Sequence, residues 1–215
     1  MKTVTELLNL TGKAAIVTGG AAGIGLGITR RLAEAGANVL IADIDREEAD
    51  RAVKELASAG VRADSIVADV AAESDVRAVT ETAVRLFGGI DILVNNAGIY
   101  PSVPLERLTP AIFDRVVAVN LRGVYLLTQR VAEQLKAQGH GGHIVNVTSI
   151  DALHPSMTGL AAYDATKDGV WGFTKNVALQ LAPYGIQASG GDVPGAQPGQ
   201  SGREQAERDP GQPRQ

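Results

Sequence analysis

Short apolar runs separated by helical patterns constrain the fold of this chain more than any other feature. The runs are rich in Ile and Val and are apolar throughout, as expected for strands covered by helices on both faces. They cover residues 14–20, 38–43, 65–70, 91–98 and 143–149. The segments between them carry apolar residues at helical spacing. Because strand and helix alternate, we predict repeated βαβ units and a doubly wound α/β fold with a parallel sheet.

The composition changes abruptly near residue 188. Before this point, two longer helices are predicted over residues 110–138 and 161–183. We expect the folded domain to span residues 1–188. Residues 189–215 contain six glycines, four prolines and five glutamines, with Val193 as the only large aliphatic residue. Such a segment buries too little apolar surface to offset its ordering entropy, so we predict a disordered tail.

Charge and cysteine content exclude several classes of function. The chain has 20 Lys and Arg against 24 Asp and Glu, a net charge of −4, so neither nucleic acid nor a membrane surface is expected as partner. Cys is absent, which removes disulfides, thiolate metal sites and cysteine nucleophiles. The three His residues show no ligand-like spacing, so no metal site is expected. The absence of a signal-like or membrane-spanning apolar stretch leads us to expect a cytoplasmic protein.

A glycine-rich turn joins the first predicted strand to the following helix. Gly19, Gly23 and Gly25 let the backbone turn sharply and approach a pyrophosphate, and Ile24 lies between the last two. Free N–H groups and the helix dipole favour negative charge at such a position. The alternative is a simple glycine turn, but its place between a strand and a helix favours nucleotide binding.

Asp43 closes the second predicted strand. A carboxylate there can accept hydrogen bonds from the free hydroxyls of an adenosine ribose and repels a 2′-phosphate, which favours NAD over NADP. In the alternative interpretation Asp43 is a helix N-cap, a position for which Asp45 is an equally good candidate.

Tyr163 and Lys167 lie four positions apart on a predicted helix, so their side chains share one face. A phenol titrates near ~10, and a neighbouring ammonium stabilises the phenolate and lowers the pKa of the phenol, as acid/base catalysis at neutral pH requires. Ser149 lies at the carboxyl end of the fifth predicted strand, at the sheet edge where ligands bind in open parallel sheets. Taken one at a time, these residues have alternative interpretations: the tyrosine and lysine as part of an ordinary amphipathic helix, and the serine as a turn or N-cap residue.

Together these motifs resemble the short-chain dehydrogenase/reductase family. The resemblance covers about residues 10–187. It rests on TGGAAGIG at 18–25, NNAG at 95–98, Asn120, Ser149 and YDATK at 163–167. It implies a Rossmann-type fold and hydride transfer between a nicotinamide and a secondary alcohol or ketone.

The resemblance also implies catalytic roles for four residues. Tyr163 would be the general acid/base, and Lys167 would lower its pKa while holding the nicotinamide ribose. Ser149 would bind the reacting oxygen, and Asn120 would hold a water in the proton relay.

Cofactor contacts are implied by the same resemblance. The phosphates would lie against the glycine turn, the adenosine ribose against Asp43, and the adenine against Asp69 and Val70. Asn95 would border the neighbouring part of the cofactor. The residues of the glycine turn are Gly19, Gly23, Ile24 and Gly25.

The chain departs from the family pattern after residue 187. GIQ at 185–187 begins a further strand, but ASGGDVPG replaces its continuation, so we expect the last strand and the substrate lid to be lacking. Our hypothesis is that the C-terminal portion is lost or read out of frame. The resemblance also implies a homodimer through helices 110–138 and 161–183. Two alternatives to the dehydrogenase remain, a 3-oxoacyl-[acyl-carrier-protein] reductase and a nucleotide-binding remnant without catalysis.

Overall fold

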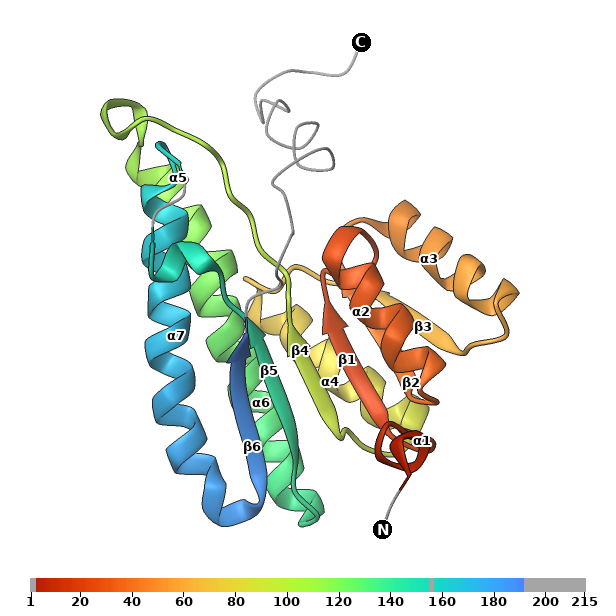
Figure 1. The fold of residues 1–215 in the computed structure, drawn as a ribbon. Coiled ribbons are helices and arrows are strands. Elements are labelled where there is room, and N and C mark those ends of the chain that lie inside the picture. Colours follow the sequence, from red (N-terminus) through yellow and green to blue (C-terminus); the bar gives the residue numbers. More distant parts are fainter. Residues whose placement is uncertain (1–2, 155–156, 192–215) are drawn as a thin grey trace.

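The computed structural model describes residues 3–154 and 157–191 and shows a parallel sheet between helices (Figure 1). The sheet has six strands in the order β3-β2-β1-β4-β5-β6, all neighbours being parallel. The strands are β1 (Ala14–Thr18), β2 (Asn38–Asp43), β3 (Ala63–Val67), β4 (Ile92–Asn95), β5 (Gly142–Val147) and β6 (Ile186–Gly191). The predicted doubly wound α/β fold of the Rossmann type is therefore confirmed.

The helices cover both faces of this sheet, and consecutive residues of β1 show why. Ile16 belongs to a buried cluster with apolar side chains of α4 and α6, whereas Ala15 and Val17 pack with those of α2. Side chains alternate across a strand, so both faces of β1 are apolar and buried. The α-helices are α1 (Val4–Leu7), α2 (Gly23–Glu34), α3 (Arg46–Ser58), α4 (Glu73–Phe87), α5 (Pro110–Val117), α6 (Gly123–Gln138) and α7 (Ala161–Leu181).

Four shorter helical turns complete the described elements. Three are 3-10 turns, η1 (Leu105–Arg107), η3 (Ile150–Ala152) and η4 (Ala182–Tyr184), and one is a π-helical turn, η2 (Ala118–Arg122). The π turn joins α5 to α6, so the helix predicted over 110–138 is present but carries this widened turn inside it. No helix among the described residues is long and apolar enough to cross a membrane.

The sixth strand corrects the predicted end of the folded domain. β6 pairs with β5 along its whole length, from Ile186 opposite Gly142 to Gly191 opposite Val147. Backbone pairing supports it without a continuous apolar run, and Gly190 lies where a Cβ would approach the ring of Trp171 on α7 to 3.2 Å. The fold thus continues past residue 188. Residues 192–215 of the predicted tail lie outside the described residues.

Asp91, just before β4, ties the starts of two central strands together. Its carboxylate accepts hydrogen bonds from Lys13 Nζ at 2.8 Å and from the backbone N–H of Ala14 at 2.9 Å. Burial raises the pKa of Asp91, but the hydrogen bonds from Lys13 and Ala14 outweigh it and hold the pKa below its ordinary value.

We expect Asp91→Asn to destabilise the fold in a pH-dependent way. A carboxyl whose pKa is lowered in the folded state stabilises the fold at pH values above its unfolded-state pKa of about 4. This contribution is lost as the pH falls through the folded-state pKa. Losing the hydrogen bond from the half-exposed Lys13, worth about 1 kcal/mol, should lower the melting temperature by about 2–4 °C at pH 7. Melts of wild type and variant at several pH values should converge at acid pH, as the pH falls through the folded-state pKa of Asp91. The exposed Asp50, changed to Asn, is the control, and an equal loss at all pH values would contradict this role of Asp91.

Candidate functional site

The glycine turn after β1 forms a tight loop at the start of α2. Gly19 has a φ of +60°, a conformation that L side chains rarely adopt. A Cβ on Gly25 would lie only 1.9 Å from Gly19 O, so the loop and the first turn of α2 touch backbone to backbone. Ile24 is partly exposed beside them. These contacts let backbone N–H groups face a ligand at the helix N-terminus.

Asn96, the residue after β4, holds this loop and was not among the site residues predicted from the sequence. Its Nδ2 donates to Thr18 O at 2.9 Å and to Gly19 O at 3.0 Å, and its backbone N–H donates to the Thr18 hydroxyl at 3.0 Å. The implied cofactor neighbour Asn95 points elsewhere. It is buried, and its Nδ2 donates to Thr128 Oγ1 at 3.1 Å and to Asn146 Oδ1 at 2.8 Å. Asn95 therefore supports the interior, and Asn96 contacts the loop.

The roles of Asp43 and Asp45 separate in the structure. Asp45 is the N-cap of α3 and accepts a hydrogen bond from Glu48 N at 3.1 Å. Asp43 turns toward the glycine loop, where its Oδ2 accepts from Ala21 N at 3.1 Å. The carboxylate thus lies beside the turn, as a contact to an adjacent ribose requires.

Asp69 and Val70 lie in the loop that follows β3. Asp69 Oδ1 accepts a hydrogen bond from Ala71 N at 2.9 Å, and its Oδ2 accepts from Arg115 Nη1 at 3.1 Å. Val70 is buried against the start of α6, where a Cβ on Gly123 would come within 2.9 Å of its side chain. The loop therefore lies against the helical segment that follows β4.

Asn120 lies in the middle of the π-helical turn and is 1% exposed. Its side chain exchanges two hydrogen bonds with the backbone of Ile99, accepting from N and donating to O, both at 2.8 Å. It also donates to Thr166 Oγ1 at 3.2 Å. Thr166 lies between Tyr163 and Lys167 on α7, so Asn120 joins the loop after β4 to the helix that carries the tyrosine and lysine.

Lys167 is buried and close to Tyr163. Its Nζ donates to Val147 O at 2.7 Å, at the carboxyl end of β5, and lies 5.5 Å from the centroid of the Tyr163 ring. Tyr100, from the loop after β4, packs its ring edge-on against Tyr163 with centroids 6.1 Å apart. The positive charge next to a phenol is the arrangement that stabilises a phenolate.

Ser149 follows β5 and begins the η3 turn, which contacts α7. Its hydroxyl accepts from Asp151 N and donates to Asp151 Oδ2, both at 3.1 Å. Negative charge continues along α7, where burial and the carboxylates of Asp151 and Asp168 raise the pKa of Asp164 above its ordinary value. The structure therefore gathers Ser149, Tyr163 and Lys167 around the carboxyl end of β5.

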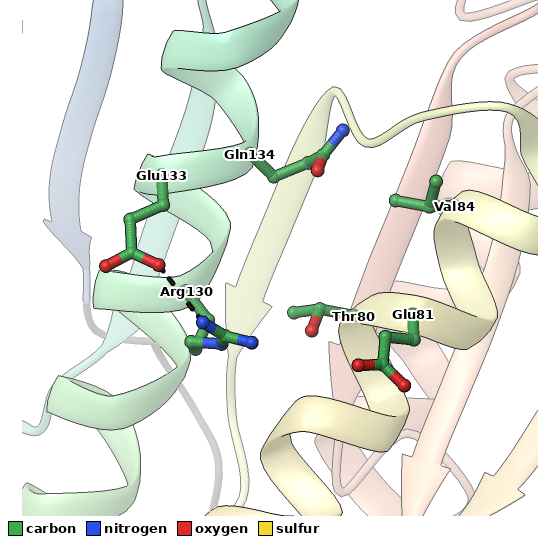
Figure 2. Close-up of a pocket in the computed structure, with 6 residues that line it drawn as sticks. All are labelled: Thr80, Glu81, Val84, Arg130, Glu133 and Gln134. Carbon is green, nitrogen blue, oxygen red and sulfur yellow. Dashed lines mark hydrogen bonds and ion pairs between the residues drawn. The ribbon is translucent and has the colours of Figure 1, made fainter.

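Figure 2 shows a hollow elsewhere on the molecule, between α4 and α6. Arg130 and Glu133 form an ion pair along one of its walls at 3.2 Å. None of the residues that line it belongs to the site described above.

The sheet and its loops define a Rossmann-type α/β protein. A family model described as short chain dehydrogenase matches residues 13–199, and the chain belongs to this family of oxidoreductases.

Relatives agree with this placement. The chain is 39% identical over 181 residues to 3beta-hydroxysteroid dehydrogenase 2 of Eggerthella lenta, covering 84% of this chain and 69% of that protein. It is 43% identical to 4-formylbenzenesulfonate dehydrogenase TsaC1/TsaC2 of Comamonas testosteroni, covering 84% and 71%. Among solved structures, the 3-ketoacyl-(acyl-carrier-protein) reductase of Brucella melitensis complexed with NADH superposes with a TM-score of 0.79 at 42% identity, covering 85% and 75%.

Proposed function

We propose that this protein is an NAD(H)-dependent oxidoreductase that interconverts a secondary alcohol and a ketone. The observation that carries the proposal is the placement of Lys167 beside Tyr163 at the carboxyl end of β5, where Ser149 also lies. The tight glycine turn beside Asp43 supports a dinucleotide as cofactor, because it packs backbone to backbone on the first turn of α2, where free N–H groups and the helix dipole favour a pyrophosphate.

In this proposal the protein manages one proton and the orientation of the substrate. A bound nicotinamide supplies the hydride acceptor or donor. During oxidation the Tyr163 phenolate takes the proton of the alcohol, and during reduction the phenol returns it to the ketone oxygen. Lys167 stabilises the phenolate, and Ser149 hydrogen-bonds the reacting oxygen. Asn120 holds the loop after β4 against α7 and so fixes the distance between them.

The activity test is spectroscopic. The chain is incubated with NAD and a panel of cyclic, aliphatic and aromatic secondary alcohols, and with NADH and the matching ketones. Formation or loss of reduced nicotinamide with at least one alcohol–ketone pair is the expected result. NADH binding without turnover of any pair would instead favour the nucleotide-binding remnant.

Cofactor choice is predicted to depend on Asp43. Its carboxylate should repel the 2′-phosphate of NADPH, so the wild type should bind NADH at least about tenfold more tightly than NADPH. Asp43→Asn should bring the two dissociation constants within about threefold of each other. Calorimetric titration measures both. Asp45→Asn is the matched control, since Asn also caps a helix, and it should preserve the preference. A wild type that prefers NADPH would contradict the proposal for Asp43.

A second candidate is reduction of a 3-oxoacyl thioester. The similarity to the Brucella melitensis reductase complexed with NADH favours it. The net charge of −4 is unfavourable to docking an acidic carrier protein. Oxidation of NADH by a 3-oxoacyl thioester, at a rate above that with simple ketones, would favour this candidate.

We also propose a homodimer through the surface of α5, α6 and α7. Phe113 on α5 and Tyr125 on α6 are 40% and 43% exposed. Tyr125 packs edge-on against Phe173 of α7, with centroids 6.4 Å apart. Aromatic side chains gathered on an exposed helical face are typical of an interface between subunits.

A further inference from the structure

Two arginines fasten the loop after β3 to the helical segment after β4. Arg115 on α5 donates to Asp69 Oδ2 at 3.1 Å. Arg122, at the end of the π-helical turn, donates to Ala71 O at 2.8 Å and pairs with Glu73. The loop and the segment lie more than forty residues apart in the chain, so these contacts are tertiary.

Both arginines contact residues 69–71, so they lie on the side of the segment that faces this loop. Asn120 is in the same π-helical turn as Arg122. Between the two arginine contacts, Val70 packs closely on Gly123, where an added Cβ would come within 2.9 Å of the Val70 side chain and 3.1 Å of its carbonyl oxygen. Three contacts therefore fix the loop that carries Asp69 and Val70 on the helical segment that carries Asn120.

The Asp69 carboxylate is held at both oxygens. Ala71 N–H binds Oδ1 and Arg115 binds Oδ2, which together prevent rotation of the carboxylate. Each carboxylate oxygen can accept more than one hydrogen bond, so Asp69 keeps acceptor capacity for a ligand. Freezing a side chain before binding removes the entropy loss that binding would otherwise incur.

We propose that Arg115 is a positioning residue for the adenine end of the cofactor. It holds the Asp69 carboxylate in the orientation that accepts a hydrogen bond from the exocyclic amino group of adenine. The inference rests on the proposed function, since it takes NADH as the ligand. It assigns to Arg115 a role in recognising one functional group, rather than a general attraction for the negatively charged cofactor.

Two ligands separate these possibilities, NADH and its analogue with hypoxanthine in place of adenine. The analogue carries a carbonyl where adenine has its amino group and has the same phosphates. Wild type should bind NADH about tenfold or more tightly than the analogue, as expected for a hydrogen bond to a charged acceptor. Arg115→Gln should lower this ratio of the two affinities to about threefold or less, mainly by weakening the binding of NADH. Arg115→Lys, which keeps the charge but not the planar fork, should give an intermediate ratio.

Arg130→Gln is the matched control, because Arg130 also forms an exposed ion pair on this helical segment, with Glu133 (Figure 2). It should leave the ratio unchanged. Melting temperatures of all variants are measured in parallel. If Arg115→Gln fails to fold, Arg115→Lys is used in its place to measure the change in the ratio.

The outcomes that overturn the inference are distinct. Equal weakening of both ligands by Arg115→Gln would show an effect of charge or stability, and an unchanged ratio would show no role. A wild type that binds both ligands equally would overturn the contact between Asp69 and the amino group. A wild type that binds neither ligand would overturn the proposed function as well, so the two failures are distinguishable.

Discussion

Replacing Tyr163 with Phe is expected to lower turnover by about 10²–10⁴-fold, the usual contribution of a positioned acid/base group. The variant keeps the ring that packs edge-on against Tyr100 and lies near Lys167 Nζ, so the surrounding structure should persist. Affinity for NADH should be nearly unchanged, since only the hydroxyl is removed. Steady-state rates with an alcohol that the wild type oxidises, together with calorimetric titration of NADH, measure the two quantities separately.

Tyr184→Phe is the matched control for this variant. Tyr184 is exposed on η4, where its ring contacts Lys136 Nζ at 4.3 Å, and it lies outside the proposed site. Removing the Tyr184 hydroxyl should leave turnover unchanged. Turnover of Tyr163→Phe within a few fold of wild type would contradict the role of Tyr163. A large loss of NADH affinity would show that the change acts on binding.

The second large effect is expected from Gly25→Ala. The added Cβ would lie 1.9 Å from Gly19 O and 2.6 Å from Asn96 Nδ2, so the backbone of the loop or of α2 must move. Overpacking commonly costs about 1–3 kcal/mol, and a clash with backbone should reach at least the upper end of that range. Because the same loop is the proposed phosphate site, NADH binding should be lost. Denaturant unfolding and NADH titration measure both effects.

Gly27→Ala is the control for this change. Gly27 lies two residues further along α2, and a Cβ there would meet no heavy atom within 4 Å. Alanine is favoured over glycine inside a helix by roughly 0.5–1 kcal/mol, so this variant should be slightly more stable than wild type. If Gly25→Ala were as stable as Gly27→Ala and bound NADH normally, the description of the loop as closely packed would be wrong.

The central strands were predictable because their sequences carry their own signal. Buried on both faces, they read as continuous apolar runs, and the 38–43 run coincides with β2 at both ends. The start of β6 was predicted at 185–187, but its continuation through residues 188–191 was not, because the support for these residues comes from pairing with β5 and from the fit of Gly190 to Trp171. Neither contact is visible in a local pattern that ends in small residues.

The site shows the same division. The glycine turn, Asp43 and the pair of Tyr163 and Lys167 were proposed as site residues from their spacing along the chain. Asn96 was missed because it acts on backbone carbonyls of a loop 77 and 78 residues away in sequence. The sequence did contain the asparagine pair at 95–96. Successive side chains of a strand point to opposite faces, and this alternation was the available clue to which of the two asparagines faces the interior.

Arg115 gave no sequence signal, because an exposed arginine on an amphipathic helix is ordinary. The role proposed for Arg115 depends on its partner Asp69, which the fold brings beside it from another βα unit. The widened turn around Asn120 was likewise hidden, since one extra residue in a helical turn hardly disturbs the apolar spacing over 110–138.

Calorimetric titration of NADH into the full chain tests the central claim most directly. The proposed cofactor site predicts saturable binding of one NADH per chain, with a dissociation constant in the micromolar range, about −8 kcal/mol. The binding should disappear in Gly25→Ala and persist in Tyr163→Phe. If the chain melts cooperatively but shows only heat of dilution with NADH and with NADPH, the proposed oxidoreductase function is contradicted.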